Sequence, residues 1–120
     1  MLLPTVMPHL KSGKVKPYAI TSDKRFPGAP DVPTVVELGM PDLESQYWLA
    51  LLAPARTPEA IIQKVHRDVL EILRSPATRE MLLAQGSEPA PGTPSELTGF
   101  MRSETAKWKK VIEVAGMRLD

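Results

Sequence analysis

Apolar residues recur at helical spacing in two long stretches of this 120-residue chain. In residues 58–74 they share one side of a helix, and charged residues occupy the other side. In residues 94–115 a second apolar stripe includes one acid, Glu104, which we expect to pair with Lys107 or Lys110 unless it lies at the edge of the buried face. The apolar positions are Ile61, Ile62, Val65, Val69, Ile72 and Leu73 in the first stretch, and Leu97, Phe100, Met101, Trp108, Val111, Ile112 and Ala115 in the second. Both patterns predict one-sided helices that must pack on something.

Three prolines that directly follow a hydroxyl residue mark where helices begin. A Ser or Thr cap accepts a hydrogen bond from a free amide of the first turn, and proline at the next position has no amide to leave unpaired. The pairs are Thr57-Pro58, Ser75-Pro76 and Thr93-Pro94. They predict helices over 58–74, 76–85 and 94–115, the last with a full capping box through Glu96.

The first part of the chain predicts shorter elements. Residues 5–11 form a short helix that ends at Gly13, with Pro8 confined to its first turn. Residues 34–38 form a single helical turn closed by Gly39. Between these turns, residues 22–33 are rich in Pro, Gly and Asp and predict a surface loop.

Two segments favour β-strands, residues 15–21 and residues 46–53. Pro17 cannot donate a ladder hydrogen bond, so it must lie at an edge or at the start of its strand. The second segment is apolar on both faces from Trp48 onward, as expected of a buried strand. Only two further short candidates exist, at 87–90 and 117–119. These strands offer too little sheet surface to cover the apolar faces of two long helices, so we expect the chain to be part of a larger fold.

Composition narrows the function classes. Fifteen basic and fourteen acidic residues give a net charge of +1, which does not indicate nucleic-acid binding. The absence of cysteine excludes thiol catalysis and disulfides, and 42% hydrophobic residues argue against disorder. We see no secretory signal, and the longest apolar run, residues 48–53, is too short to span a bilayer. Expressed as given, the chain is expected in the cytoplasm.

No catalytic or metal-binding motif stands out. His9 and His66 are the only histidines, and neither has a companion at metal-ligand spacing. No phosphate-binding loop or nucleophile motif occurs. We therefore predict a protein that is not an enzyme and that uses no metal and no cofactor. Tyr47 and Trp48 are best interpreted as core residues, with lining of a cleft as the alternative.

Four ordered motifs resemble those of the tripartite tricarboxylate transporter substrate-binding receptors, also called the Bug family. They are GKVKPYAITSDKR at 13–25, PDVPTVVELG at 30–39, WLALLAPARTP at 48–58, and GSEP at 86–89 followed by Thr93, Phe100, Lys107 and Trp108. The resemblance covers essentially the whole chain. Arg56 departs from the family pattern, which has glycine there; we interpret it as a solvent-facing loop residue, with attraction of an anion at the following helix as the alternative.

The resemblance implies an α/β fold of the type II periplasmic binding-protein kind, here incomplete and helix-rich. Family members are periplasmic receptors with two hinged domains, which capture small carboxylates and hand them to a membrane permease. By this resemblance, residues 1–46 end the second, inserted domain, and residues 47–120 supply the crossing strand and C-terminal helices of the first.

Two interpretations of function remain open. In the first, the chain is the C-terminal part of a carboxylate receptor, and Trp48 and Thr34 are the candidate ligand-binding residues because they lie near the expected crossing between domains. In the second, it is a truncated structural module that binds no ligand and uses its uncovered helix faces to form a homo-oligomer. For the 120-residue chain alone, we expect an oligomer and no measurable carboxylate binding.

Overall fold

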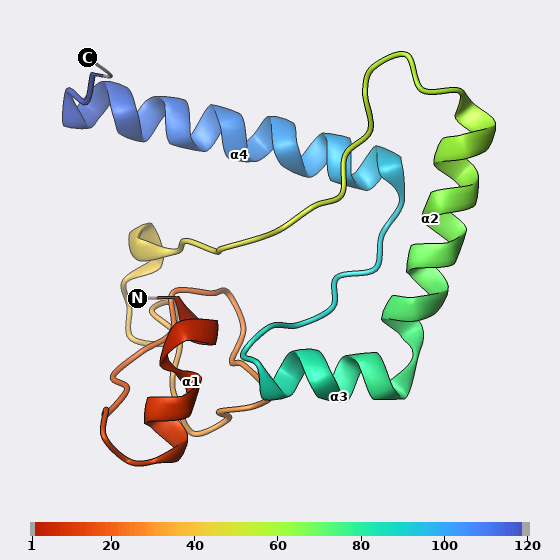
Figure 1. The fold of residues 1–120 in the computed structure, drawn as a ribbon. Helices are drawn as coiled ribbons and strands as arrows, with labels where there is room; N and C mark the ends of the chain where they lie inside the picture. Colours follow the sequence, from red (N-terminus) through yellow and green to blue (C-terminus); the bar gives the residue numbers. More distant parts are fainter. Residues whose placement is uncertain (1, 119–120) are drawn as a thin grey trace.

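Four α-helices and one short 3₁₀ helix make up the regular structure of the computed structural model, which describes residues 2–118. The helices are α1 (Leu3–Lys11), η1 (Pro41–Leu43), α2 (Glu59–Arg74), α3 (Pro76–Ala84) and α4 (Pro94–Ala115). Figure 1 shows α1, η1 and the loops between them gathered at one side, while α2, α3 and α4 extend as separate rods. The predicted helices over 76–85 and 94–115 are thus confirmed within one residue.

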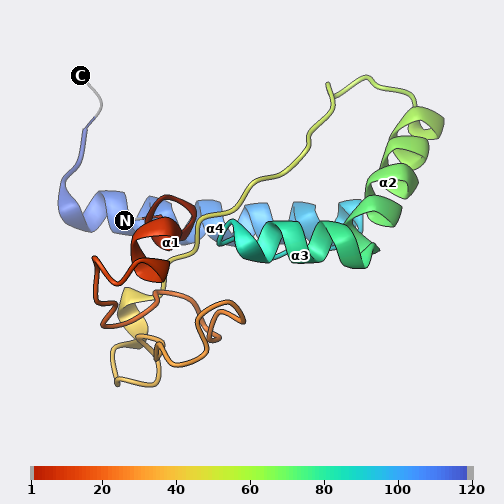
Figure 2. The same cartoon turned by 60° about the horizontal axis from the view of Figure 1, so that its bottom comes forward.

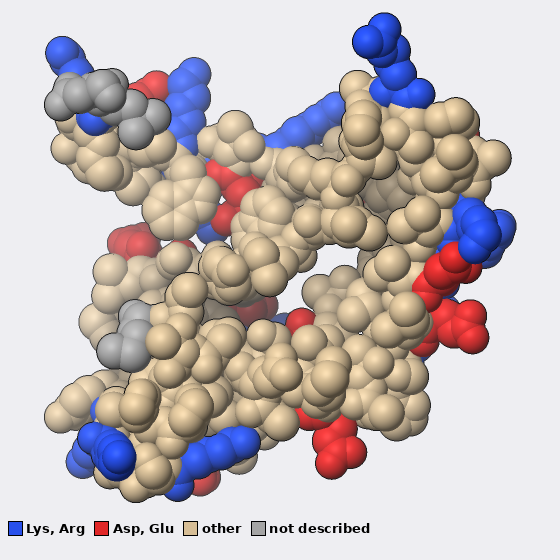
Figure 3. Space-filling model, viewed as in Figure 1, with Lys and Arg blue, Asp and Glu red and all other residues tan. Residues whose placement is uncertain are grey.

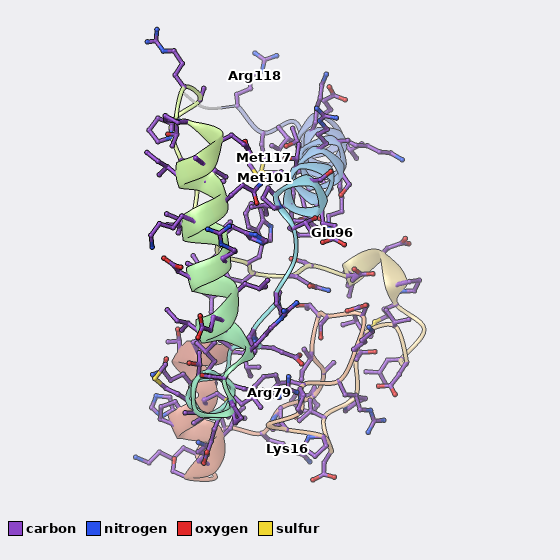
Figure 4. All side chains as sticks on the ribbon, turned by 90° about the vertical axis from the view of Figure 1, so that its right-hand side faces the viewer. Lys16, Arg79, Glu96, Met101, Met117 and Arg118 are labelled. Atoms are coloured by element: carbon purple, nitrogen blue, oxygen red, sulfur yellow. The ribbon has the colours of Figure 1, made fainter. Side chains whose placement is uncertain are left out.

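The capping residues act as the sequence predicts in two of three cases. The Ser75 hydroxyl accepts from the Thr78 amide at 3.2 Å, and this cap begins α3. Thr93 and Glu96 form a reciprocal capping box at the start of α4, where Figure 4 labels Glu96. Thr57 does not cap α2. The N-cap is Pro58, which has no capping side chain, and the Thr57 amide instead bonds the Pro54 carbonyl in a turn.

Helix α1 is longer than predicted. It begins at Leu3, so Pro8 lies in its interior and not in its first turn. The prediction about Pro8 was wrong because Pro4 already occupies the first turn, where its missing amide leaves nothing unpaired. The end of the helix is as predicted: Lys11 is its last residue, and Gly13 follows with a positive φ of 69°.

Neither predicted strand forms a sheet within residues 2–118. Of residues 15–21, only Ile20 pairs, in a single parallel bridge to Thr34. Residues 46–53 are extended but make no backbone–backbone hydrogen bond. Residues 87–90 are also irregular, and of the candidate at 117–119 the last residue lies outside the described part. Strands need neighbours, and the described residues supply none for the 46–53 segment.

The few buried apolar side chains all lie in the first third of the chain, in α1 and the following loops: Met7, Phe26, Val32 and Val35. The predicted turn at 34–38 forms here, with the Leu38 amide on the Thr34 carbonyl, and Gly39 follows with φ 76°. Residue Gly86, after α3, packs against α1, and the Lys11 ammonium donates to the Ala84 carbonyl at 3.3 Å. The small core therefore joins α1 to the end of α3.

The remaining helices bury little. No residue of α2 is buried, and its apolar residues Ile61 and Ile72 are 54% and 59% exposed. Helices α2 and α3 meet at Ser75, and the His66 ring Nε2 lies 2.8 Å from the Gly92 carbonyl, which ties α2 to the segment before α4. Figure 1 shows α2, α3 and α4 spread apart, and Figure 2 shows α2 at the end of the molecule opposite α1. In the space-filling view of Figure 3 an opening lies near the middle of the molecule, and Lys and Arg lie mostly at its outer edge.

The molecule exposes more surface than a compact protein of its size. Its accessible surface is 9691 Å², against about 6,400 Å² for a compact 13.2 kDa monomer. Its radius of gyration is 17.1 Å, against about 14 Å for a compact 120-residue domain. We expected that the chain would not bury the apolar faces of its long helices, and this expectation is confirmed for the described residues.

Candidate ligand-binding site

The two predicted site residues lie in different surroundings. Trp48 belongs to the extended 46–53 segment, which leads from η1 toward α2 (Figure 1), and is 38% exposed. Thr34 lies in the loops of the first third of the chain and is 1% exposed. Each is held by its own cluster of side chains, and these clusters define what the two residues can do.

Trp48 packs against α4. Its ring meets the Phe100 ring edge to face, with centroids 5.3 Å apart and planes at 77°. Such aromatic pairs are favourable because the positive edge of one ring meets the negative face of the other. With 38% of its surface exposed, Trp48 is neither fully core nor fully free. It can present an aromatic surface to a ligand while α4 holds it in place.

Glu104 lies one helical turn beyond Phe100 on α4, and it is buried, with 8% of its surface exposed. Its carboxylate accepts a hydrogen bond from the Trp108 indole N–H at 3.1 Å and pairs with the Lys107 ammonium. The predicted Lys107 partner is thus confirmed. The pKa of Glu104 is lowered chiefly by the Lys107 hydrogen bond; burial opposes this, and the Trp108 and Trp48 side chains lower it further.

Thr34 closes a reciprocal pair of hydrogen bonds with Glu37. The Glu37 amide donates to the Thr34 hydroxyl at 3.1 Å, and the Thr34 amide donates to the Glu37 carboxylate at 2.8 Å. This is a capping box on a single turn. The Thr34 hydroxyl is therefore already engaged within the chain. A ligand would contact the turn that Thr34 stabilises and not the hydroxyl itself.

Arg25 completes this second cluster and was not foreseen as a site residue. Its Nε donates to both carboxylate oxygens of Glu37, and one of its terminal nitrogens donates to the Pro30 carbonyl at 2.9 Å. The Arg25 hydrogen bond is the largest cause that holds the pKa of Glu37 below its usual value, followed by the Thr34 amide. The T-x-x-E spacing of Thr34 and Glu37 could have revealed the capping box, and Arg25 is the last residue of the motif at 13–25.

A shallow depression of about 430 Å³ lies between α1 and α3, and Gly28 of the 22–33 loop also lines it. Its lining includes two cations, Lys11 and Arg79. Lys11 donates to the Ala84 carbonyl, and Arg79 lies 3.8 Å from the Glu88 carboxylate. Each cation thus has one partner within the chain, a neutral carbonyl for Lys11 and a carboxylate for Arg79.

The described residues contain no group of three His, Asp or Glu side chains that could hold a metal ion. Arg56 is exposed in the turn before α2, in agreement with a solvent-facing loop residue. None of the helices within residues 2–118 is long and apolar enough to cross a membrane.

Comparison with known proteins identifies the family. The model of the tripartite tricarboxylate transporter family receptor matches residues 1–117. This chain belongs to that receptor family. BugT of Bordetella pertussis is 37% identical to it over 117 residues, and an Agrobacterium vitis relative is 36% identical over 110 residues. The family is one of solute receptors and not a class of enzymes.

Solved structures agree on the fold. The periplasmic binding protein BugD matches 92% of this chain with a TM-score of 0.79 and 31% identity. A Rhodopseudomonas palustris protein solved with adipate matches 95% of the chain, with a TM-score of 0.82 and 34% identity. MatC from the same organism, solved with malate, matches 92% with a TM-score of 0.78 and 34% identity. The expected helix-rich part of a periplasmic binding-protein fold is confirmed.

The matches cover most of this chain but only part of each relative. The chain spans 36% of BugT and 32% of the Agrobacterium vitis protein. It spans 38% of each of the adipate-bound, malate-bound and BugD structures. The given chain thus matches only about a third to two fifths of the length of these relatives.

Proposed function

We propose that this chain is the C-terminal part of a periplasmic receptor that captures small carboxylates and delivers them to a tripartite tricarboxylate-type membrane permease. The similarity to receptors solved with adipate and with malate, over 92–95% of the chain, carries this proposal. Both ligands are dicarboxylates, so the proposal names a class of acid and not one compound. Binding would proceed by closure of two hinged domains, without a covalent step.

The division of the chain supports a hinge near residue 46. All four buried apolar side chains precede this residue, and the extended segment follows it at once. We place the end of the second, inserted domain at residues 1–46, and the crossing strand with the C-terminal helices of the first domain at residues 47–120. Trp48 would then lie directly after the crossing between the domains.

Trp48 and Thr34 are the proposed ligand-binding residues. Trp48 offers a partly exposed aromatic ring that α4 already orients. Thr34 contributes through its turn, because its hydroxyl bonds the Glu37 amide. Substitution Thr34→Ser keeps that hydroxyl, and Thr34→Ala removes it. Comparison of the two variants therefore separates the effect of the turn on ligand binding from the effect of the Thr34 methyl group.

A chimera tests the proposal directly. Residues 1–118 of this chain would replace the matching segment of the R. palustris adipate-bound protein, and adipate binding would be measured by calorimetry. We expect the chimera to bind adipate and the Trp48→Ala chimera to bind it at least tenfold more weakly, an effect of about 1.4 kcal/mol. Substitution Leu49→Ala, at the 83% exposed neighbour, is the matched control. A folded chimera without adipate binding would contradict the proposal.

The exposed surface favours a second candidate function, an oligomerising module that binds no ligand. The chain exposes about 3,300 Å² more than a compact monomer would, which is more than a standard-size protein interface buries. Light scattering on the 120-residue chain tests this candidate. We expect a dimer or larger species that Ile72→Lys, on the exposed apolar face of α2, dissociates and that Lys64→Glu, on the polar face, does not. A monomer at all concentrations would exclude it.

A further inference from the structure

Side-chain and backbone hydrogen bonds tie the start of the extended 46–53 segment to the loops of the first third of the chain. The Ser45 amide donates to the Thr21 carbonyl at 2.8 Å, and the Thr21 hydroxyl donates back to the Ser45 carbonyl at 2.7 Å. The Gln46 side-chain amide donates to Asp23 Oδ1 at 3.0 Å. We propose that Thr21 and Asp23 are positioning residues: with Ser45 and Gln46 they form an anchor, and the chain is free to bend only after Gln46.

The anchor is connected to the small buried core through the residue before Thr21. The Ile20 amide donates to the Pro33 carbonyl at 2.9 Å, and the Ile20 carbonyl accepts from the Val35 amide at 2.8 Å. Val35 itself is only 4% exposed. In an extended chain, successive residues direct their backbone polar groups to opposite sides. Ile20 therefore bonds the buried turn on one side, while Thr21 bonds Ser45 on the other.

The two bonds between Thr21 and Ser45 protect each other. Thr21 is exposed and Ser45 is half-buried, so water can compete for a single bond between them. Because the hydroxyl bond joins the same two residues as the backbone bond, Ser45 can move away only when both open together. We therefore expect the Thr21 hydroxyl to slow the opening of the Ser45 amide.

Beyond Gln46 the contacts of the chain change. Residues 47–53 make no backbone–backbone hydrogen bond, and Trp48 packs on Phe100 of α4. Figure 1 shows this segment as it leaves η1 and runs toward α2. The anchor thus marks where contact with the first third of the chain ends. Its use as the fixed side of a hinge rests on the proposed function, whereas the anchor itself does not.

Amide hydrogen exchange of the ¹⁵N-labelled 120-residue chain tests the bonds between Thr21 and Ser45. We expect the Ser45 amide to be protected about tenfold or more over the amides of residues 47–53. Thr21→Val, which removes the hydroxyl, should speed Ser45 exchange about fivefold or more, and Thr21→Ser should keep it slow. Thr98→Val is the matched control, because the Thr98 hydroxyl also donates to a carbonyl, that of Pro94 in α4. It should leave Ser45 exchange unchanged.

The side-chain amide peaks of Gln46 test the second bond. Asp23→Ala removes the acceptor and should shift these peaks, whereas Asp23→Asn keeps an acceptor oxygen and should shift them much less. Asp31→Ala, at an exposed acid of the same loop, should leave them in place. Gln46 peaks that do not respond to Asp23→Ala would remove Asp23 from the anchor.

Two results would overturn the role of Thr21. One is a Ser45 amide that exchanges as fast as those of residues 47–53. The other is an equal acceleration of Ser45 and Val35 exchange in Thr21→Val, which would mean that Thr21 supports the whole region and not this position. If Thr21→Val fails to fold, exchange in the unmodified chain decides. None of these measurements involves a ligand, so loss of adipate binding in the chimera would reject the proposed function without affecting this inference.

Discussion

The Nε atom of Arg25 lies 3.0 Å from Oε1 and 2.9 Å from Oε2 of Glu37, so one guanidinium N–H is shared by both carboxylate oxygens. The same carboxylate accepts the Thr34 amide, and Arg25 also donates to the Pro30 carbonyl. These bonds hold the ends of the loop at residues 22–33 together. The described residues contain a single β-bridge. This cluster of side-chain hydrogen bonds therefore holds the loops together where other proteins use the hydrogen bonds of a sheet.

Substitution Glu37→Ala should release this loop. It removes the carboxylate that accepts hydrogen bonds from the Arg25 side chain and from the Thr34 amide. We therefore expect hydrogen exchange of the Thr34 amide to become at least several-fold faster. Asp68→Ala is the control, since it removes an exposed ion pair to Lys64 on α2, and should leave Thr34 exchange unchanged. An equal effect of the two variants would show that the Glu37 hydrogen bonds do not protect this turn.

Gly86 should tolerate alanine poorly, for two separable reasons. Its φ is 79°, which disfavours any side chain, and a Cβ there would lie 2.6 Å from the Met7 Cγ. Gly39, with φ 76° and no atom near its missing Cβ, supplies the conformational cost alone. We expect Gly39→Ala to lower the free energy of unfolding by about 1–2 kcal/mol, and Gly86→Ala by about 1–3 kcal/mol more. Urea denaturation measures both, and equal losses would contradict the close packing of α1 on this glycine.

The helices could be predicted from sequence because their signals are local. A hydroxyl cap, the following proline and a terminal glycine lie at the ends of the helix they delimit, as Thr93, Pro94 and Gly116 do for α4. Thr57 misled the prediction because Pro58 adopts φ −56° and ψ 138°, which is not helical, so the helix starts one residue later. From the sequence alone, a Thr-Pro pair whose proline is the first helical residue cannot be distinguished from one whose proline precedes the helix.

The strands and the site could be predicted only in part. Apolar residues at 46–53 indicate a buried strand, but the strands it would pair with are not among the described residues. Trp48 was chosen because the family resemblance places it near the crossing between the domains, and it remains a prediction as a ligand-binding residue. Its edge-to-face contact with Phe100 could not be foreseen, because it joins segments far apart in the chain. The Arg25–Glu37 pair was missed for the same reason.

Removing the Thr93 hydroxyl should weaken α4. In Thr93→Ala the Glu96 amide loses its acceptor at 3.2 Å, and loss of such a cap costs about 1 kcal/mol. Thr57→Ala is the matched control, because the Thr57 side chain does not cap α2. We expect Thr93→Ala to reduce the thermal midpoint followed by circular dichroism, with little change for Thr57→Ala. Comparable losses in both variants would mean that Thr57 caps α2 after all.

Acid should destabilise the fold through three glutamates. The pKa of Glu37 is lowered first by the Arg25 hydrogen bond, that of Glu96 by the Thr93 amide, and that of Glu104 by Lys107. A carboxyl whose pKa is lower in the folded state binds protons more readily once unfolded, so its stabilisation is complete above the unfolded value of about 4.3 and is lost as the pH falls through the folded value. We therefore expect the free energy of unfolding to fall steadily below about pH 4.3.

Salt should separate these contributions. At 1 M NaCl the Debye length is about 3 Å, which weakens the exposed Arg25–Glu37 pair but affects the hydrogen bonds from the Thr93 amide and hydroxyl to Glu96 much less. In urea denaturation across pH 3–6, Glu37→Gln should flatten the acid slope strongly at low salt and weakly at high salt. Glu96→Gln should flatten it to a similar degree in both. A free energy of unfolding that rises as the pH falls from 5 to 3 would contradict the direction assigned to all three carboxyl groups.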